Sequence, residues 1–189
     1  MYGFEHGRPG CFAGGPATKL RERFRLLWLQ HVYWTRMVII AIAAGSPDLE
    51  ATTRRLLRNA PDMGRLFGRF YGPDAATEIT RLIRNHLTIA AELVTAAKAG
   101  DKRAAADAER RWYANGAEIV RFLTQLNPCW SAEGLQAMWN EHLALTKAEA
   151  VARLNGDFAR DIEVFDRIER QALMMADEFA AGICHQFDL

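Results

Sequence analysis

The chain has 189 residues, of which 50% are hydrophobic and 10% aromatic. A chain of this size and composition can bury a sizeable core, which excludes a wholly disordered protein and makes a single domain the expectation. Lysine and arginine, 24 in number, nearly balance the 23 aspartates and glutamates, so the formal net charge is +1. This balance excludes a basic surface over the whole chain, and we expect no nucleic-acid partner.

The sequence indicates neither a membrane span nor a secretory signal. No run of about 18 uncharged apolar residues occurs, and the most apolar stretch, residues 37–44, is too short to cross a bilayer. Residues 1–17 are rich in glycine and proline and are interpreted as a disordered leader. Cys11, Cys129 and Cys184 form no CxxC motif, which is typical of reduced thiols. We therefore expect a cytoplasmic protein without a membrane partner.

Apolar residues recur at intervals of three and four from Thr18 onward, which predicts helices throughout and no sheet. Turn and capping residues at 45–48, 71–74, 100–101, 127–131 and 155–157 divide the chain. The expected helices, in chain order, cover residues 18–44, 48–70, 74–98, 102–126, 131–153 and 157–185. Pro61 is expected to interrupt the second of them, because a proline inside a helix removes a hydrogen bond and clashes with the preceding turn.

Long helices joined by short connections pack antiparallel to their neighbours in sequence. We therefore predict an all-α fold, an up-and-down antiparallel helical bundle of about six helices with a four-helix-bundle core. No shift in composition marks a second domain, so residues 18–189 are expected to form one.

Three histidines stand at the centres of three predicted apolar stripes. At ~100° per residue, the residues within ~60° of His31, His86 and His142 on their helices are almost all apolar. Each histidine also lies about 11 to 13 residues after the expected start of its helix, so antiparallel packing places all three near one level of the bundle. A buried imidazole needs a polar partner, and these three are expected to be partners of one another.

A metal ion is one way to satisfy these histidines. Counting along the last two helices places Glu169 opposite His142, so we predict a metal site formed by His31, His86, His142 and Glu169, with Glu149 or Asp161 as alternative carboxylates. Imidazole and carboxylate ligands suit iron, manganese or zinc. Thr35 and Thr146, one turn after their histidines, are candidates for orienting the rings. Such a centre would support a redox or oxygen-related role, although no substrate or reaction is indicated.

Two other interpretations stay open. In the first, the histidines form a metal-free hydrogen-bond network that fixes helix register in a structural or interaction protein, with a second copy of the chain as one candidate partner. Asn115 and Glu118 would belong to that network. In the second, Trp28, Trp139 and Met138 line a cavity for a small apolar ligand. The Glu-x-x-His pair of di-iron carboxylate bundles is absent, which disfavours a ferroxidase of that type.

Several segments carry a resemblance to a known family: LWLQHVYWTR at 27–36, LIRNH at 82–86, WYANGAEI at 112–119 and NPCW at 127–130. They resemble a family of small bacterial all-helical bundle proteins without an assigned reaction, whose members often bear the transferred name acetylglutamate kinase. The resemblance runs from about residue 20 to the end and implies a helical bundle and no kinase activity. More distantly, the histidine-bearing helices are similar to metal-binding bundles of the ferritin and haemerythrin type, which implies a metal in the bundle core.

Overall fold

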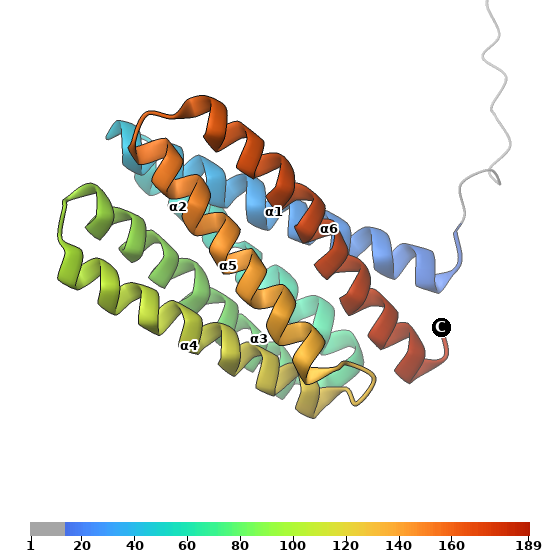
Figure 1. Ribbon diagram of the computed structural model, residues 1–189. Coiled ribbons are helices and arrows are strands. Elements are labelled where there is room, and N and C mark those ends of the chain that lie inside the picture. The colour runs from blue at the N-terminus through green and yellow to red at the C-terminus, as the bar shows by residue number, and fades with distance from the viewer. Residues whose placement is uncertain (1–13) are drawn as a thin grey trace, which may run out of the picture.

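The predicted all-α antiparallel bundle is confirmed by a computed structural model that describes residues 14–189. Its helices are α1 (Pro16–Ala44), α2 (Leu49–Leu57), α3 (Asn59–Lys98), α4 (Lys102–Leu126), α5 (Ala132–Leu154) and α6 (Phe158–Phe187). The described residues contain no strand. Figure 1 shows the helices running side by side in alternating directions. The expected leader lies, for residues 1–13, outside the described part of the chain, and α1 begins two residues earlier than expected.

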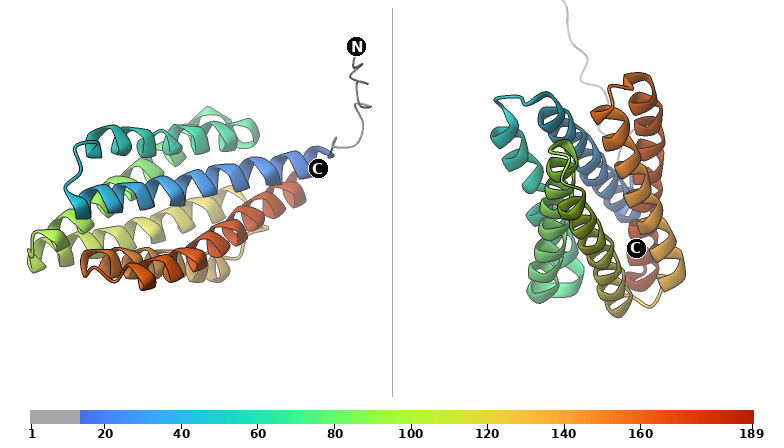
Figure 2. Two further views of the ribbon diagram at one scale, coloured as in Figure 1. Left: turned by 90° about the horizontal axis from the view of Figure 1, so that it is seen from above. Right: turned by 60° about the vertical axis from the view of Figure 1, so that its left-hand side comes forward.

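Five long helices enclose one core. Each packs against its neighbours in the order α1, α6, α5, α4, α3 and back to α1, while the short α2 lies over α1 and α3. The two further views in Figure 2 show this arrangement from above and from one end. The sequence predicted four helices around the core. The fifth is added because α3 packs on both α1 and α4 and closes the ring of helices.

The third helix reverses direction within its own length. Gly72 has φ of 83° and ψ of −180°, a backbone conformation that side chains other than glycine rarely adopt. Residues 59–71 and 73–98 therefore form two antiparallel arms, which Figure 2 shows as neighbouring teal and green segments. The arms touch closely, since a Cβ on Gly64 would overlap Thr80 Oγ1 and the backbone oxygen of Ala76. The turn expected at residues 71–74 is thus present.

The interruption expected at Pro61 is also present. The segment predicted as one helix over residues 48–70 is divided between α2, which ends at Leu57, and the first arm of α3, which begins at Asn59. Pro61 then falls in the first turn of α3, where its missing N–H has no partner to lose. This break places Asn59 at the start of a helix and turns it into the core, where it is 1% exposed.

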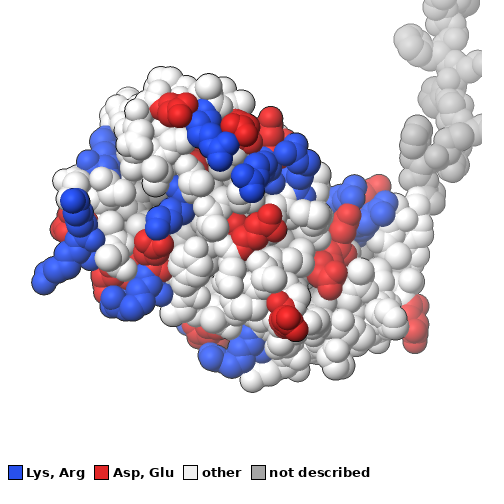
Figure 3. All heavy atoms as spheres, viewed as in Figure 1, with Lys and Arg blue, Asp and Glu red and all other residues white. Residues whose placement is uncertain are grey.

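The charge on the surface and the apolar character of α1 are relevant to nucleic-acid and membrane partners, neither of which is expected from the sequence. Positive and negative side chains are mixed over the face drawn in Figure 3, without a large area of one sign. Among the described residues, α1 is long and apolar enough to cross a membrane, but 44% of its most apolar window is buried inside the bundle. Core helices of soluble proteins and signal sequences meet the same criterion.

Candidate metal centre

The structure brings His31, His86 and His142 together in the middle of the core. They come from α1, α3 and α5, and each is at most 2% exposed. The ring centroids are 5.8 Å apart for His31 and His86, 5.5 Å for His31 and His142, and 5.9 Å for His86 and His142. One nitrogen of each ring lies within 4.8 Å of the corresponding nitrogens of the other two. The common level predicted from helix depth is therefore observed.

An asparagine from a neighbouring helix holds the first of these rings. The Nδ1 atom of His31 lies 3.0 Å from Oδ1 of Asn59. The amide nitrogen of Asn59 in turn donates to the backbone oxygen of Leu27 at 2.9 Å. Because Leu27 is four residues before His31 on α1, the amide is fixed between the ring and the turn below it.

The same arrangement recurs on the second ring. The Nδ1 atom of His86 lies 3.2 Å from Oδ1 of Asn115 on α4. The amide nitrogen of Asn115 donates to the backbone oxygen of Leu82, again four residues before the histidine, at 3.2 Å. Asn115 therefore orients a histidine and joins two helices.

The third ring has an amide partner that is only half engaged. Gln171 on α6 donates its amide nitrogen to the backbone oxygen of Met138, four residues before His142, at 2.9 Å. Its Oε1 and the Nδ1 of His142 are both buried, and neither completes a hydrogen bond within the described residues. The amide of Gln171 is therefore fixed to the backbone as in the other two pairs, but its hydrogen bond to the histidine ring is not formed.

These amides determine which ring nitrogen carries the proton. Because the amide nitrogens of Asn59 and Asn115 face backbone oxygens, their oxygens face the rings. An amide oxygen only accepts, so Nδ1 of His31 and of His86 must be the N–H donor. Neutral imidazole carries one proton, which leaves Nε2 as the nitrogen with a free lone pair. These rings are therefore prepared to bind through Nε2.

Burial keeps the rings neutral at physiological pH. Loss of solvation lowers the pKa of His31 to about 4, although its contact with Asn59 acts in the opposite direction. Burial, together with the neighbouring His31, lowers the pKa of His142 to about 3. The pKa of His86 is depressed by burial first and then by His31 and His142. Neutral imidazole is the form that binds a metal.

Three tryptophans surround the histidine rings and exclude water. Trp28 lies 5.2 Å from His31 and 5.6 Å from His142 between ring centroids. Trp139 and Trp112 lie 5.1 Å and 5.4 Å from His86. All three are at most 1% exposed, and their indole N–H groups have no hydrogen-bond partner among the described residues. The surroundings of the centre are therefore apolar but for these donors.

The predicted carboxylate is not part of the group. Glu169 is half-buried on the other side of α6, beside Tyr33. Burial and then the negative charge of Glu169 raise the pKa of the Tyr33 hydroxyl. Gln171 takes the place expected for Glu169, because the buried stripe of α6 centres nearer Ile168 and Met175.

The alternative carboxylates belong to a separate cluster. Arg36 donates to Glu149 at 2.7 Å and to Asp161 at 2.6 Å and 3.1 Å. Arg153 lies 3.1 Å from Asp161 as a further ion pair. Glu149 and Asp161 are each 1% exposed. Neither carboxylate belongs to the group that the three histidines form.

The two threonines do not hold the rings. Thr146 Oγ1 donates to the backbone oxygen of His142 at 2.9 Å, and Thr35 Oγ1 has no hydrogen-bond partner among the described residues. Glu118 accepts from Arg81 at the surface rather than joining the core network. Trp28, Trp139 and Met138 pack in the core, and none of them lines any of the three best-formed pockets in residues 14–189.

Sequence reasoning missed Asn59 and Gln171. Gln171 stands in the apolar stripe of α6, between Ile168 and Met175, and an uncharged polar residue at such a position was the available signal. Asn59 could be found only by placing the helix break at residue 58, because its direction depends on where the following helix begins.

Comparison of the chain with protein-family models, curated proteins and solved structures finds no match. The function must therefore be argued from the centre itself. Its ligand atoms are imidazole nitrogens without a carboxylate, which differs from the glutamate-rich sites of di-iron bundles. Three neutral imidazoles around one point can bind a transition metal, share a proton or hold a water molecule.

Proposed function

We propose that this protein binds one divalent transition metal ion through Nε2 of His31, His86 and His142. The observation that carries the proposal is the repeated anchoring of these rings. Each faces an amide that is itself fixed to the backbone four residues before the histidine. Partners of this kind orient the rings of metal-binding histidines and raise their basicity.

A metal explains the inner side of the rings better than a hydrogen-bond network does. With Nδ1 as the donor, the Nε2 atoms of His31 and His86 are acceptors, and two acceptors cannot satisfy one another. Leaving them unpaired in an apolar core would cost free energy. A cation at the centre of the three rings pairs these lone pairs, and also that of His142 once its Nδ1 donates to Gln171. The metal-free network remains the competing proposal, and the experiment below separates the two.

The spacing and the donor set favour zinc or iron. Zinc–nitrogen bonds are ~2.0–2.1 Å, which corresponds to nitrogens ~3.4 Å apart around a tetrahedral ion. The three nitrogens lie within 4.8 Å of one another, so a short inward movement of the rings would close the site. Imidazole suits zinc, iron, copper and nickel, whereas manganese prefers oxygen ligands. Zinc or iron is therefore preferred to the manganese considered from the sequence.

Three protein ligands leave one coordination position open, an arrangement typical of catalytic zinc sites. Bound zinc would supply Lewis acidity there, and bound iron would permit the redox role expected from the sequence. The chain's own contribution is to hold three neutral nitrogens, to exclude water with Trp28, Trp112 and Trp139, and to keep the rings deprotonated.

Metal content decides the proposal. Untagged protein would be purified and reconstituted with zinc or iron(II), and its metal measured by inductively coupled plasma mass spectrometry. We expect about one equivalent in the wild type and none in the triple variant His31→Gln, His86→Gln and His142→Gln. The single variant His142→Gln covers the case in which the triple variant does not fold.

His185→Gln is the matched control, because His185 is an exposed histidine on α6. This variant should retain the metal. Full metal content in the triple variant would place the ion elsewhere. Wild-type protein that binds no metal after reconstitution would overturn the proposal and favour the buried hydrogen-bond network.

A further inference from the structure

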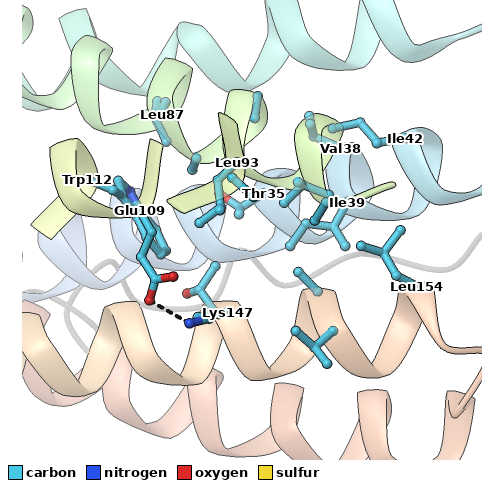
Figure 4. Close-up of a pocket in the computed structure, with 18 of the residues that line it drawn as sticks. Thr35, Val38, Ile39, Ile42, Leu87, Leu93, Glu109, Trp112, Lys147 and Leu154 are labelled. Carbon is cyan, nitrogen blue, oxygen red and sulfur yellow. Dashed lines mark hydrogen bonds and ion pairs between the residues drawn. The ribbon is translucent and has the colours of Figure 1, made fainter. Parts of the chain in front are cut away.

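An apolar pocket of about 280 Å³ lies between α1, α3, α4 and α5, with α2 contributing Leu56. Its volume is close to the ~300 Å³ lower end of small-molecule sites. Figure 4 shows Val38, Ile39 and Ile42 of α1 facing Leu87 and Leu93 of α3 across this space. Such a pocket favours apolar occupants, because it offers water few partners.

On α1 and α5 the pocket begins one helical turn beyond the histidines, and on α3 it begins at Leu87, next to His86. Thr35, Ala90 and Thr146, which line it, are each four residues after His31, His86 and His142. Further lining residues follow on the same helices, as far as Ile42, Ala97 and Leu154. At 1.5 Å per residue, the step from the first lining residue of α1 to the last spans ~10.5 Å. The pocket therefore runs from the histidine level toward one end of the bundle.

Trp112 connects the pocket with the centre. It lines the pocket, and its ring stacks on that of His86 at 5.4 Å and 29° between planes. The helix that carries it runs opposite to α3 and α5, and its other lining residues, Glu109 and Lys102 among them, lie progressively farther from the histidines. Trp112 is therefore on the inner wall.

The inner end carries two unused hydrogen-bonding groups. Thr35 Oγ1 and Trp112 Nε1 are buried and have no partner among the described residues. Thr146 Oγ1, by contrast, already donates a hydrogen bond to the backbone oxygen of His142. An indole N–H only donates and a hydroxyl can donate, so each group would be satisfied by an oxygen acceptor. An acceptor at this end of a ligand would also be the part nearest to the histidines.

The charge of the pocket lining favours a neutral ligand. Lys147 and Glu109 lie on its side wall and pair with each other at 2.5 Å, as the dashed line in Figure 4 marks. Lys102, the other charged lining residue, is exposed to solvent near the start of α4. No unpaired charge among the lining residues is buried, and a carboxylate at the inner end would lose its hydration without a counter-charge from the pocket walls.

From these observations we infer that the pocket is the substrate site of the histidine centre. Its ligand is a neutral, chain-like apolar molecule with a carbonyl oxygen directed at Thr35 and Trp112. The inference rests on the proposed function in one respect, since the bound metal would polarise that oxygen as a Lewis acid. Binding in the pocket itself requires only the residues that line it.

The test uses 2-octanone and the indole N–H signals of the full-length protein in ¹H–¹⁵N correlation spectra. Trp112→Phe assigns the Trp112 signal. We expect 2-octanone to shift this signal downfield and to leave that of Trp130 unchanged, because Trp130 Nε1 already donates to the backbone oxygen of Glu178. A titration that moves both signals equally, or neither, would overturn the inference.

Two variants test the place of binding. Ala150→Phe fills the pocket two turns after His142, and we expect affinity for 2-octanone to fall at least tenfold. Ala137→Phe, on an exposed position of the same helix, is the matched control and should bind normally.

Thr35→Val tests the hydrogen bond, because it keeps the shape of the side chain but removes the hydroxyl. It should weaken 2-octanone about fivefold, as expected for one hydrogen bond, and leave toluene binding unchanged. Equal weakening of both ligands would contradict the assigned role of Thr35.

Metal content is measured on the same samples, so the two proposals can fail separately. Zinc should tighten 2-octanone binding at least threefold and leave toluene unaffected. If the protein takes up no metal but still binds 2-octanone, the proposed metal site is wrong and the proposed ligand pocket stands. Stoichiometric zinc without any shift of Trp112 would overturn the pocket alone. Octanoate that binds more tightly than 2-octanone would overturn the neutral ligand class.

Discussion

Two buried polar clusters lie in the same core and are built in opposite ways. The histidine centre consists of His31, His86 and His142 with their three amides. The ion-pair cluster consists of Arg36, Arg153, Glu149 and Asp161. Glu149 is seven residues after His142, a distance of ~10.5 Å along the helix. Both clusters draw residues from α1 and α5, so their differences do not come from location.

Each acid of the ion-pair cluster has a charged partner. Its two acidic side chains are matched by two arginines, and Arg36 contacts both acids. Burial raises the pKa of Glu149 to about 7, even though Arg36 acts in the opposite direction. The cluster therefore has the features of a structural tie between helices.

The histidine centre carries no formal charge, and two of its three rings complete a hydrogen bond to an amide. Its rings lie against one another, and three indole N–H groups beside them have no partner among the described residues. The comparison teaches that buried polarity alone does not indicate a site. What indicates one is a set of groups that is held in place and still lacks a partner of a definite kind, which in the function proposed above is a cation.

Acid should produce the largest difference between the clusters in metal-free protein. A histidine whose pKa is depressed in the folded state favours folding above its ordinary pKa of 6.5, and this contribution is lost as the pH falls toward the folded value. Each such group costs roughly 1.4 kcal/mol per pH unit in that window, so three cost ~4 kcal/mol per unit. Urea unfolding between pH 7 and pH 5 measures the slope.

Glu149 should oppose this slope, because a raised carboxyl pKa makes the folded state gain stability as the pH falls from about 7 toward 4.5. The variant Glu149→Gln is therefore expected to lose stability more steeply with acid than the wild type. An unchanged or shallower slope in the variant would show that Glu149 is already ionised near pH 5.

Removing the shared arginine should damage the ion-pair cluster and spare the histidine centre. Arg36→Met leaves two buried acids with only Arg153, and the loss of a partner in a buried pair costs ~3–5 kcal/mol. We expect about 3 kcal/mol, the lower end of that range, by urea unfolding at pH 7. Arg25→Met is the control, since Arg25 and Asp177 are 41% and 38% exposed and such pairs contribute ~0–1 kcal/mol. Similar losses in the two variants would contradict the assigned difference in burial.

Metal should stabilise the protein through the histidine centre alone. At free zinc one hundred times its dissociation constant, the free energy of unfolding should rise by ~2.7 kcal/mol. His86→Gln should abolish this gain, whereas Arg36→Met should retain it on a lower baseline. The measurement is urea unfolding with and without zinc. A gain that survives in His86→Gln would assign the stabilisation to another site.

The sequence predicted the meeting of the histidines because two simple regularities determine it. Helical period places His31, His86 and His142 on buried faces, and similar depth in antiparallel helices places them at one level. Both are averages over whole helices and tolerate errors of a few residues. The bundle itself was predictable for the same reason, including the turn at residues 71–74.

The partners of the histidines were less predictable because each depends on a single residue. Glu169 and Gln171 are two positions apart, and two positions correspond to ~200° around a helix. The buried face of α6 also includes Ile168 and Met175, which displace its centre away from Glu169 and toward Gln171. The orientation of Asn59 could be predicted only by placing the start of the helix directly after Arg58. The pocket depends on which apolar side chains leave space between the helices, and helical periodicity does not specify this.

The amides offer the finest test of how the centre is held. Asn115→Leu and Gln171→Leu should each lower zinc affinity ~10–100-fold, as losses of ring-orienting partners generally do. Their effects on metal-free stability should differ, because Asn115 contacts its ring at 3.2 Å while the contact between Gln171 and His142 is open. Asn115→Leu should therefore be the more destabilising, by about 1 kcal/mol, the contribution of one hydrogen bond. Zinc titration and urea unfolding measure the two quantities. Equal losses of metal-free stability would mean that Gln171 already forms a hydrogen bond with His142 in the metal-free protein. The three pairs of histidine and amide would then be alike without a metal.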